Sequence, residues 1–228
     1  GVPWRAGKVM IVYATHEGGR YLPLDESLRE MPTGKRGIYV NITNQCNCAC
    51  TFCLRTMKEM REESSLWLKE EPSVDEVKAK LDGVPWDYAG EVVFCGFGEP
   101  TMRLDALLEL LRYVKAKHPQ IPTRVNTNGL GELADGREFA AEFKGILDTV
   151  SISLNASNAE RYFELTRARY GQKSYEAMLT FAQHCKPYVP HVVLTVVDHV
   201  EDSEEIRKCR AICAERGLTL RVRVYEDS

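Results

Sequence analysis

The amino-acid sequence predicts an α/β fold in which six parallel strands form an incomplete, TIM-like barrel. Three observations lead to this prediction. Six short apolar segments alternate with helical patterns, which is typical of parallel sheets whose crossovers are helices. The chain has 228 residues, whereas a complete eightfold barrel needs about 250, so six βα units indicate a partial (β/α)6 barrel. A hydrophobic content of 44% and a net charge of −3 favour a globular domain and exclude binding of nucleic acids by overall charge.

The predicted strands are short and bounded by polar or glycine-containing segments. In chain order they cover residues 37–43, 91–95, 123–127, 149–154, 191–197 and 218–225. Ahead of them, residues 9–15 and 20–24 flank Gly18 and Gly19, a pattern that predicts a hairpin. We therefore expect an N-terminal extension with this hairpin at residues 1–36 and one barrel domain at residues 37–228.

Helical patterns lie between the strands. Ser73 and Glu76 resemble a capping box that opens one helix. Apolar residues three or four apart predict three further helices, with the stripes Leu104, Leu107, Leu108, Leu111 and Val114; Met178, Phe181, Ala182 and Cys185; and Ile206, Cys209, Ile212 and Cys213. Because three cysteines lie on these stripes, we expect them to be core residues rather than ligands.

Several strands alternate polar and apolar residues, unlike ordinary parallel strands buried on both faces. A period of two places each polar set on one face of its strand. We expect helices to cover the apolar face and the polar face to line a hydrated interior that holds a polar ligand. An open sheet with these residues at its strand ends is the alternative. The polar sets are Asn41 and Thr43; Arg124, Asn126 and Asn128; Ser151, Ser153 and Asn155; and Arg221 and Arg223.

A cluster of cysteines follows the first barrel strand, at the end of the sheet where ligands bind in α/β folds. It consists of Cys46, Cys48, Cys50 and Cys53. Three thiolates at x3 and x2 spacing can hold three corners of a cubane iron–sulfur cluster, which leaves one iron open for chemistry. The alternative is a zinc knot that includes Cys48, although the spacing is cramped for a tetrahedral site.

Two motifs resemble those of the radical S-adenosylmethionine (radical SAM) superfamily. The first is Cys46-x3-Cys50-x2-Cys53 with the aromatic Phe52 before the last cysteine. The second is the turn after the second barrel strand, Gly96-Phe97-Gly98-Glu99-Pro100, which is similar to the family's Gly-Gly-Glu-Pro turn. Phe97 stands where the family has its first glycine. Glycines there let the backbone approach a ligand, and a glutamate can accept a hydrogen bond from a ligand amine.

This resemblance implies one [4Fe–4S] cluster bound by Cys46, Cys50 and Cys53, with S-adenosyl-L-methionine on the open iron. Reductive cleavage would give a 5′-deoxyadenosyl radical that abstracts hydrogen from an unidentified substrate, the reaction of a radical SAM oxidoreductase. The implied contacts to S-adenosylmethionine are Phe52, Gly96, Phe97, Gly98, Glu99, Asn126, Asn128, Ser153, Asn155 and Val197. The Gly-x-Ile-x-Gly-x-x-Glu pattern of some members is absent from the fifth strand, which leaves the adenine contacts open. No further catalytic side chain is predicted.

The expected partners follow from the same resemblance. They are S-adenosylmethionine and an external flavodoxin-like or ferredoxin-like one-electron donor. The slender N-terminal hairpin and the short loops predict an exposed barrel mouth, and hence a macromolecular substrate. Activation of a protein partner by formation of a glycyl radical is one alternative, and an iron–sulfur electron carrier or sensor without catalysis is another. Residues 39–44, 94–103 and 125–129 are similar to radical SAM proteins associated with TatD-family nucleases. Without a long apolar run or a signal-peptide pattern, the chain is expected to be cytoplasmic, with no membrane partner.

Overall fold

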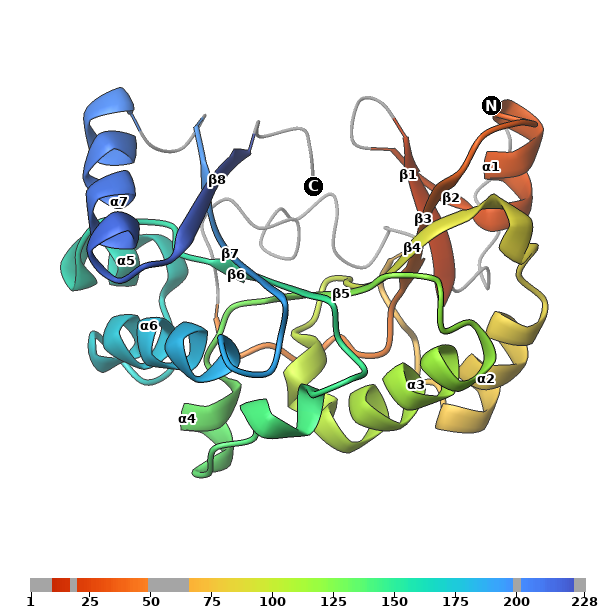
Figure 1. Cartoon of the computed structure of the whole chain (residues 1–228), viewed down its shortest axis with the longest axis horizontal. Coiled ribbons are helices and arrows are strands. Elements are labelled where there is room, and N and C mark those ends of the chain that lie inside the picture. Colours follow the sequence, from red (N-terminus) through yellow and green to blue (C-terminus); the bar gives the residue numbers. More distant parts are fainter. Residues whose placement is uncertain (1–9, 17–19, 49–65, 199–201, 224–228) are drawn as a thin grey trace.

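A computed structural model describes residues 10–16, 20–48, 66–198 and 202–223, which form a single curved sheet with helices along its outer side (Figure 1). The predicted ligands Cys50 and Cys53 and the predicted contact Phe52 lie outside the described residues. The strands are β1 (Val12–His16), β2 (Arg20–Pro23), β3 (Arg36–Val40), β4 (Ala89–Phe94), β5 (Thr123–Thr127), β6 (Thr149–Ser153), β7 (His191–Val197) and β8 (Thr219–Arg223).

Helices follow most strands and provide the crossovers. They are α1 (Leu24–Glu30), α2 (Val74–Asp82), α3 (Leu104–Lys117), α4 (Gly131–Asp135), α5 (Ala159–Thr166), α6 (Lys173–Cys185) and α7 (Ser203–Glu215), with 3₁₀ turns η3 (Trp86–Tyr88), η4 (Pro100–Arg103) and η5 (Ala140–Phe143). The Ser73 side chain accepts from the Glu76 amide and caps α2, as the sequence predicts. The apolar stripe of α3 is buried, also as predicted.

The strand order in the sheet is β2-β1-β3-β4-β5-β6-β7-β8. β1 pairs antiparallel with β2 and with β3, and every pair from β3 to β8 is parallel. The sheet is not closed, since β2 and β8 are its two free edges. These findings confirm the partial (β/α)6 barrel and the N-terminal hairpin. The hairpin extends the sheet at one edge, and a domain boundary at residue 37 stays a prediction.

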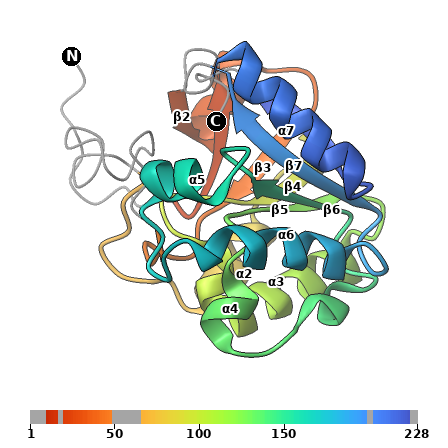
Figure 2. The ribbon, with the colours of Figure 1, turned by 90° about the vertical axis from the view of Figure 1, so that its left-hand side faces the viewer.

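The two faces of the sheet differ as the alternation predicts. Helices α2, α3, α4 and α6 lie along the outer face (Figure 2). The strand residues that pack there belong to one large core cluster: Ile38, Val40, Val92, Phe94, Val125, Val150, Ile152, Leu194 and Val196. The intervening residues face inward and include the polar side chains of β5, β6 and β8. Burying apolar groups on one face only leaves the inner face available for polar ligands.

Three of the eight cysteines belong to this core. Cys185, Cys209 and Cys213 are buried among apolar side chains of α6 and α7. Burial raises the pKa of Cys213 to about 11, so its thiol stays protonated at neutral pH. Because a metal ligand must be a thiolate, these positions are poor ligands. The core assignment from the apolar stripes is confirmed.

Candidate functional site

The segment after β3 leads to the cysteine cluster and is held by the segment that follows the cluster. Asn41 Nδ2 donates to the carbonyl oxygen of Leu66 at 2.7 Å. Asn44 Nδ2 donates to the carbonyl oxygen of Leu68 at 2.5 Å, and Asn44 Oδ1 accepts from the Leu68 backbone amide at 3.0 Å. The chain therefore enters and leaves the stretch that contains Cys50 and Cys53 at fixed, adjacent points.

Charged and polar side chains reinforce this anchoring. Glu71 accepts from Thr43 Oγ1 at 2.6 Å and from Gln45 Nε2 at 2.5 Å. Arg103 Nη1 donates to the carbonyl oxygens of Ile42 at 2.7 Å and Pro72 at 2.9 Å. Hydrogen bonds from charged groups are stronger than neutral ones, so these contacts fix the backbone just before Cys46.

The two glycines of the turn after β4 are required by the neighbouring chain. A Cβ at Gly96 would lie 2.2 Å from Asn41 Oδ1, and one at Gly98 would lie 2.2 Å from the carbonyl oxygen of Thr43. The sequence predicts that these glycines let a ligand approach the backbone. In the described structure they let the segment after β3 approach it, which brings the turn beside the cysteine segment. Contact of Gly96 and Gly98 with S-adenosylmethionine stays a prediction.

Glu99 connects the turns after β4 and β5. Its carboxylate is 3% exposed and accepts from four donors: the Thr101 amide at 2.8 Å, Thr101 Oγ1 at 2.7 Å, Thr127 Oγ1 at 2.8 Å and the Asn128 amide at 2.6 Å. Burial raises the pKa of Glu99, although these hydrogen bonds oppose the shift. The predicted acceptor for a ligand amine is thus occupied by protein donors, and its visible role is to hold the two turns together.

Asn128 links this network to the first predicted ligand cysteine. Its Nδ2 lies 3.9 Å from Cys46 Sγ and 3.7 Å from Cys48 Sγ, and it also donates to Asn47 Oδ1. An amide donor beside a thiolate stabilises the negative charge on sulfur. The structure therefore brings together Asn128 and Cys46, two residues that the sequence assigns to one site.

Four other predicted contacts lie on β5, β6 and β7 or just after β6. Asn126 Oδ1 is buried and accepts no hydrogen bond from the described residues. Ser153 lies opposite Thr195 across β6 and β7, and Val197 ends β7. Asn155 has a φ of 67°, a left-handed conformation that asparagine tolerates better than most residues. Its backbone amide donates to the carbonyl oxygen of Thr195 at 3.2 Å. All four lie at or near the carboxyl ends of their strands.

Phe97 departs from the family pattern, and the structure shows where its ring lies. The ring belongs to a small apolar cluster with Met10, Tyr13 and Leu66, and it lies 6.5 Å from the ring of Trp67. Phe97 therefore packs the turn against the N-terminal hairpin. This packing leaves the backbone of Phe97 as the part that a ligand could contact.

Sequence reasoning missed several residues that build the site. Thr101 and Thr127 supply donors to Glu99, Asn47 joins Asn128, and the Arg169 amide donates to the carbonyl oxygen of Asn47 at 2.9 Å. Thr101, Thr127 and Asn47 lie in or beside the motifs predicted from the sequence, whereas Arg169 lies in none of them, and hydrogen bonds between motifs depend on the fold. The sequence could have indicated the residues that lie in a motif, but it could not show which residues they bond.

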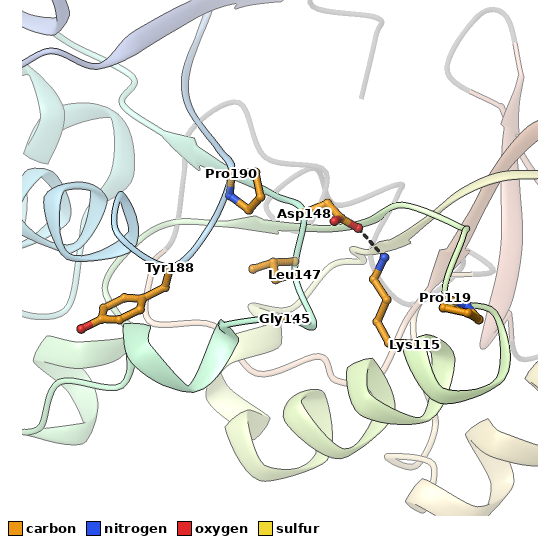
Figure 3. A pocket seen from close by; sticks show the side chains of 7 residues that line it. All are labelled: Lys115, Pro119, Gly145, Leu147, Asp148, Tyr188 and Pro190. Atoms are coloured by element: carbon orange, nitrogen blue, oxygen red, sulfur yellow. Dashed lines mark hydrogen bonds and ion pairs between the residues drawn. The ribbon is translucent and has the colours of Figure 1, made fainter.

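A hollow lies at the opposite end of the strands from these residues (Figure 3). It has a volume of about 330 Å³ and is lined by Lys115, Pro119, Gly145, Leu147, Asp148, Tyr188 and Pro190. Lys115 Nζ points to Asp148 Oδ2 at 2.6 Å. Asp148 also accepts from the Thr123 amide at 2.8 Å, so its carboxylate ties together the amino ends of β5 and β6. None of the predicted site residues lines this hollow.

The described residues fit the two predicted cofactors. Cys46 offers a sulfur ligand beside an amide donor, and the buried Asn126 Oδ1 offers an acceptor to the amine and hydroxyl donors of S-adenosylmethionine. Within the described ranges, no group of three or more His, Cys, Asp or Glu residues is placed to hold a metal ion. Two of the three predicted ligand cysteines lie outside those ranges. The assignment of Cys46, Cys50 and Cys53 therefore stays a prediction.

Comparison with known proteins places these features in a family. The chain is 30% identical to a GTP 3′,8-cyclase of Paenarthrobacter nicotinovorans over 56% of its own length and 34% of the relative. It is 28% identical to a putative glycyl-radical enzyme activating enzyme of Methanocaldococcus jannaschii over 71% of its length and 62% of the relative. The chain thus spans about a third of the first relative and just under two thirds of the second.

Solved structures agree on the fold. Streptococcus suis SuiB bound to S-adenosylmethionine superposes with a TM-score of 0.61 at 18% identity, over 88% of this chain and 42% of SuiB. The family model described as the Radical SAM superfamily matches residues 40–211, more than half of the chain. Enzymes of this superfamily use a [4Fe–4S] cluster and S-adenosylmethionine, so the predicted family, enzyme class and cofactors are confirmed at the level of the family. The similarity to TatD-associated proteins stays a prediction. The chain belongs to the radical SAM superfamily.

Proposed function

We propose that this chain is a radical SAM enzyme in which Cys46, Cys50 and Cys53 bind one [4Fe–4S] cluster. The bound cluster and S-adenosylmethionine would supply a 5′-deoxyadenosyl radical that abstracts hydrogen from the substrate. The observation that carries the proposal is the convergence of Cys46, Asn128 and the Glu99 network at the carboxyl ends of β3, β4 and β5. In this fold, that end of the sheet is where reactions take place.

The chain's own residues would act mainly by positioning. Asn128 would stabilise the thiolate of Cys46 by donating its side-chain amide, while its backbone amide is fixed by Glu99 at 2.6 Å. Asn126 Oδ1 would accept a donor of S-adenosylmethionine, which would satisfy a buried acceptor. Ser153, Asn155 and Val197 would contact the rest of this cosubstrate, together with Phe52 and the backbone of Gly96, Phe97 and Gly98.

The proposal includes partners and a location. An external one-electron donor of the flavodoxin or ferredoxin type would reduce the cluster. A reducing compartment such as the cytoplasm fits thiolate ligands, which oxidation would remove. Within the described residues, no helix is long and apolar enough to cross a membrane.

Low-temperature electron paramagnetic resonance on the anaerobically reconstituted, reduced protein tests this proposal. A cluster signal that shifts when S-adenosylmethionine is added supports an open iron that binds the cosubstrate. A signal that does not shift contradicts the proposal and favours an electron carrier or sensor. Zinc without iron or sulfide in the purified protein also contradicts it and favours the zinc knot.

Two single substitutions sharpen the ligand assignment. Cys46→Ala should abolish the cluster, because three thiolates are the minimum for this type of site. Cys48→Ala is the matched control, since its sulfur lies at a similar distance from Asn128 Nδ2, 3.7 Å against 3.9 Å. Cys48→Ala should keep its full iron and sulfide content. Loss of the cluster in both variants would support a site with four cysteines.

A second candidate is activation of a protein partner by glycyl-radical formation. It is favoured by the Methanocaldococcus jannaschii relative, of which this chain covers 62%. Formation of 5′-deoxyadenosine should then depend on the macromolecular fraction of an extract from the source cells. Full activity with the small-molecule filtrate of the same extract would contradict this candidate and leave the general proposal standing.

A further inference from the structure

The turn that follows β6 has a strained backbone at Asn155. The φ of Asn155 is 67°, in the left-handed region, and the Ala156 amide donates to the carbonyl oxygen of Leu154 at 2.8 Å. A hydrogen bond that spans two residues, with a positive φ at the central one, defines a γ-turn of the rare and strained type. Strain of this kind persists only where the surrounding structure enforces it, and it is common at functional sites.

The side chain of Asn155 has a polar group available for a ligand. Asn155 is 6% exposed, and its side-chain amide forms no hydrogen bond with any residue in the described ranges. Buried polar side chains nearly always have a hydrogen-bond partner. A ligand that both donates and accepts hydrogen bonds would satisfy this amide, and S-adenosylmethionine carries amine, hydroxyl and carboxylate groups that can do so.

Strand β7 and helix α6 hold the two residues that flank Asn155. The carbonyl oxygen of Thr195 on β7 accepts from the Leu154 amide at 2.9 Å and from the Asn155 amide at 3.2 Å. The Tyr175 hydroxyl on α6 donates to the carbonyl oxygen of Ala156 at 2.9 Å. Tyr175 is buried, and burial raises the pKa of its hydroxyl, which therefore stays protonated and able to donate at neutral pH.

Glu205 in the first turn of α7 holds the next residue of the turn, Ser157. Glu205 Oε2 accepts from the Ser157 amide at 2.9 Å, and Glu205 Oε1 accepts from the Ser157 hydroxyl. Asp202 is the N-cap of α7, so Glu205 occupies the third helical position, from which a glutamate commonly bonds back to the N-cap. Here each carboxylate oxygen accepts from Ser157, and this contact ties the strained turn to the helix that follows β7.

We propose that Tyr175 and Glu205 are positioning residues that hold Asn155 in the strained turn and thereby determine the affinity for S-adenosylmethionine. This inference rests on the proposed function, which assigns Asn155 to this cosubstrate. Tyr175 and Glu205 act through Ala156 and Ser157, which follow Asn155 directly in the chain. Without their contacts, the backbone of Asn155 would relax to a negative φ and move its side chain away from the binding position.

Isothermal titration calorimetry with S-adenosylmethionine on the anaerobically reconstituted protein tests this inference. Glu205→Ala should weaken binding about fivefold and Tyr175→Phe about threefold. Glu205→Gln should lose less affinity than Glu205→Ala, because the amide oxygen keeps one acceptor for Ser157. The matched control is Glu204→Ala, which removes the neighbouring carboxylate from the same helix turn. Glu204 is exposed and pairs with Arg207, so its removal should leave the affinity unchanged.

A second substitution separates positioning of Asn155 from a general effect on the fold. Asn155→Gly adopts a positive φ without strain but lacks the side chain, so it should weaken binding about tenfold. If Glu205 acts through Asn155, adding Glu205→Ala to Asn155→Gly should weaken binding no further. A purely structural role of Glu205 would lower the affinity by the same factor in both backgrounds. Thermal unfolding of each variant shows whether it is folded.

Three results would overturn the inference: unchanged affinity in Glu205→Ala, equal weakening by Glu204→Ala, or equal effects of Glu205→Ala with and without Asn155→Gly. If Glu205→Ala does not fold, Tyr175→Phe in the same two backgrounds decides the question. Paramagnetic resonance of the wild type separates the outcomes. A signal that shifts with S-adenosylmethionine, together with unchanged affinity in Glu205→Ala, contradicts this inference alone. A wild type that neither shifts nor binds the cosubstrate contradicts the proposed function, and the inference with it.

Discussion

The two ends of the parallel strands are held together in different ways. At the carboxyl ends, the fully buried Glu99 carboxylate joins the turns after β4 and β5 through four uncharged donors. At the amino ends, the partly exposed Asp148 carboxylate pairs with the Lys115 ammonium and accepts from the Thr123 amide. Both carboxylates connect neighbouring strands, but only Glu99 does so without a cationic partner among the contacts described.

This difference shows which end of the sheet contains the features that are unfavourable for stability. Three features lie at the carboxyl ends: the buried Glu99 carboxylate without a cation among its described contacts, the buried Asn126 Oδ1 without a donor among the described residues, and two glycines that closely approach Asn41 and Thr43. Features of this kind are unfavourable for stability and common at functional sites. At the amino ends, the Asp148 carboxylate pairs with the opposite charge of Lys115, which is what stability alone would favour.

The largest expected effect comes from removing the Glu99 carboxylate. Glu99→Ala should lower the free energy of unfolding by about 3 kcal/mol or more, because it leaves buried donors of Thr101, Thr127 and Asn128 without an acceptor. Asp148→Asn should cost only about 1 kcal/mol, since solvent can replace part of its contacts. Urea denaturation of both variants measures the difference. Equal losses would show that the two ends depend on their carboxylates to the same extent.

The next effect concerns the glycines. Gly98→Ala should destabilise the protein by about 2 kcal/mol and reduce cluster content, because its Cβ would collide with the backbone carbonyl of Thr43. The control at the amino ends is Gly145→Ala, where a Cβ meets nothing within 4 Å and only the φ of 79° is unfavourable. That strain costs about 1 kcal/mol. Iron analysis and thermal unfolding test both variants, and normal cluster content in Gly98→Ala would contradict the proposed packing.

The alternation of polar and apolar residues was enough to predict the strands and their two faces. The period of two in β5 and β6 depends only on local sequence, so the outer core and the polar inner face could be predicted. The helix cap at Ser73 was predictable for the same reason. The short helices α1 and α4 were not predicted, because seven and five residues are too few for a clear helical period.

The candidate site was predicted as a set of motifs but not as a network. The sequence indicates Glu99, Asn128 and Cys46 separately, and their hydrogen bonds connect residues up to 82 positions apart. It also does not show what Gly98 admits, because a glycine that lets a ligand approach and a glycine that lets a neighbouring segment approach look the same in a sequence. Only the fold shows that Thr43 fills that space.

The pH dependence of stability provides a smaller test at the amino ends. Burial raises the pKa of Asp148, but the Lys115 and Thr123 contacts outweigh it, and the pKa lies below its ordinary value. A carboxylate with a lowered folded-state pKa stabilises the protein above its unfolded-state pKa of about 3.9, and this contribution is lost as the pH falls through the folded-state value. The stability difference between wild type and Asp148→Asn should therefore shrink from about pH 5 to about pH 3 in urea denaturation. A constant difference would contradict the ion-pair explanation.

The smallest effect on stability, and the most informative, is expected for Asn126 on β5. Its Oδ1 accepts no hydrogen bond from the described residues, so Asn126→Ala should change the free energy of unfolding by less than about 0.5 kcal/mol. Calorimetry should nevertheless show about tenfold weaker binding of S-adenosylmethionine, since the acceptor is lost.

The control is Thr123→Ala on the same strand, where Oγ1 donates to the carbonyl oxygen of Ile146 at 2.7 Å. Thr123→Ala should cost about 1 kcal/mol of stability and leave the affinity for S-adenosylmethionine unchanged. The two substitutions lie three residues apart on one strand. Opposite responses would show that Asn126 serves binding of S-adenosylmethionine and Thr123 serves stability. A stability loss in Asn126→Ala without weaker binding would instead show that Asn126 serves the fold.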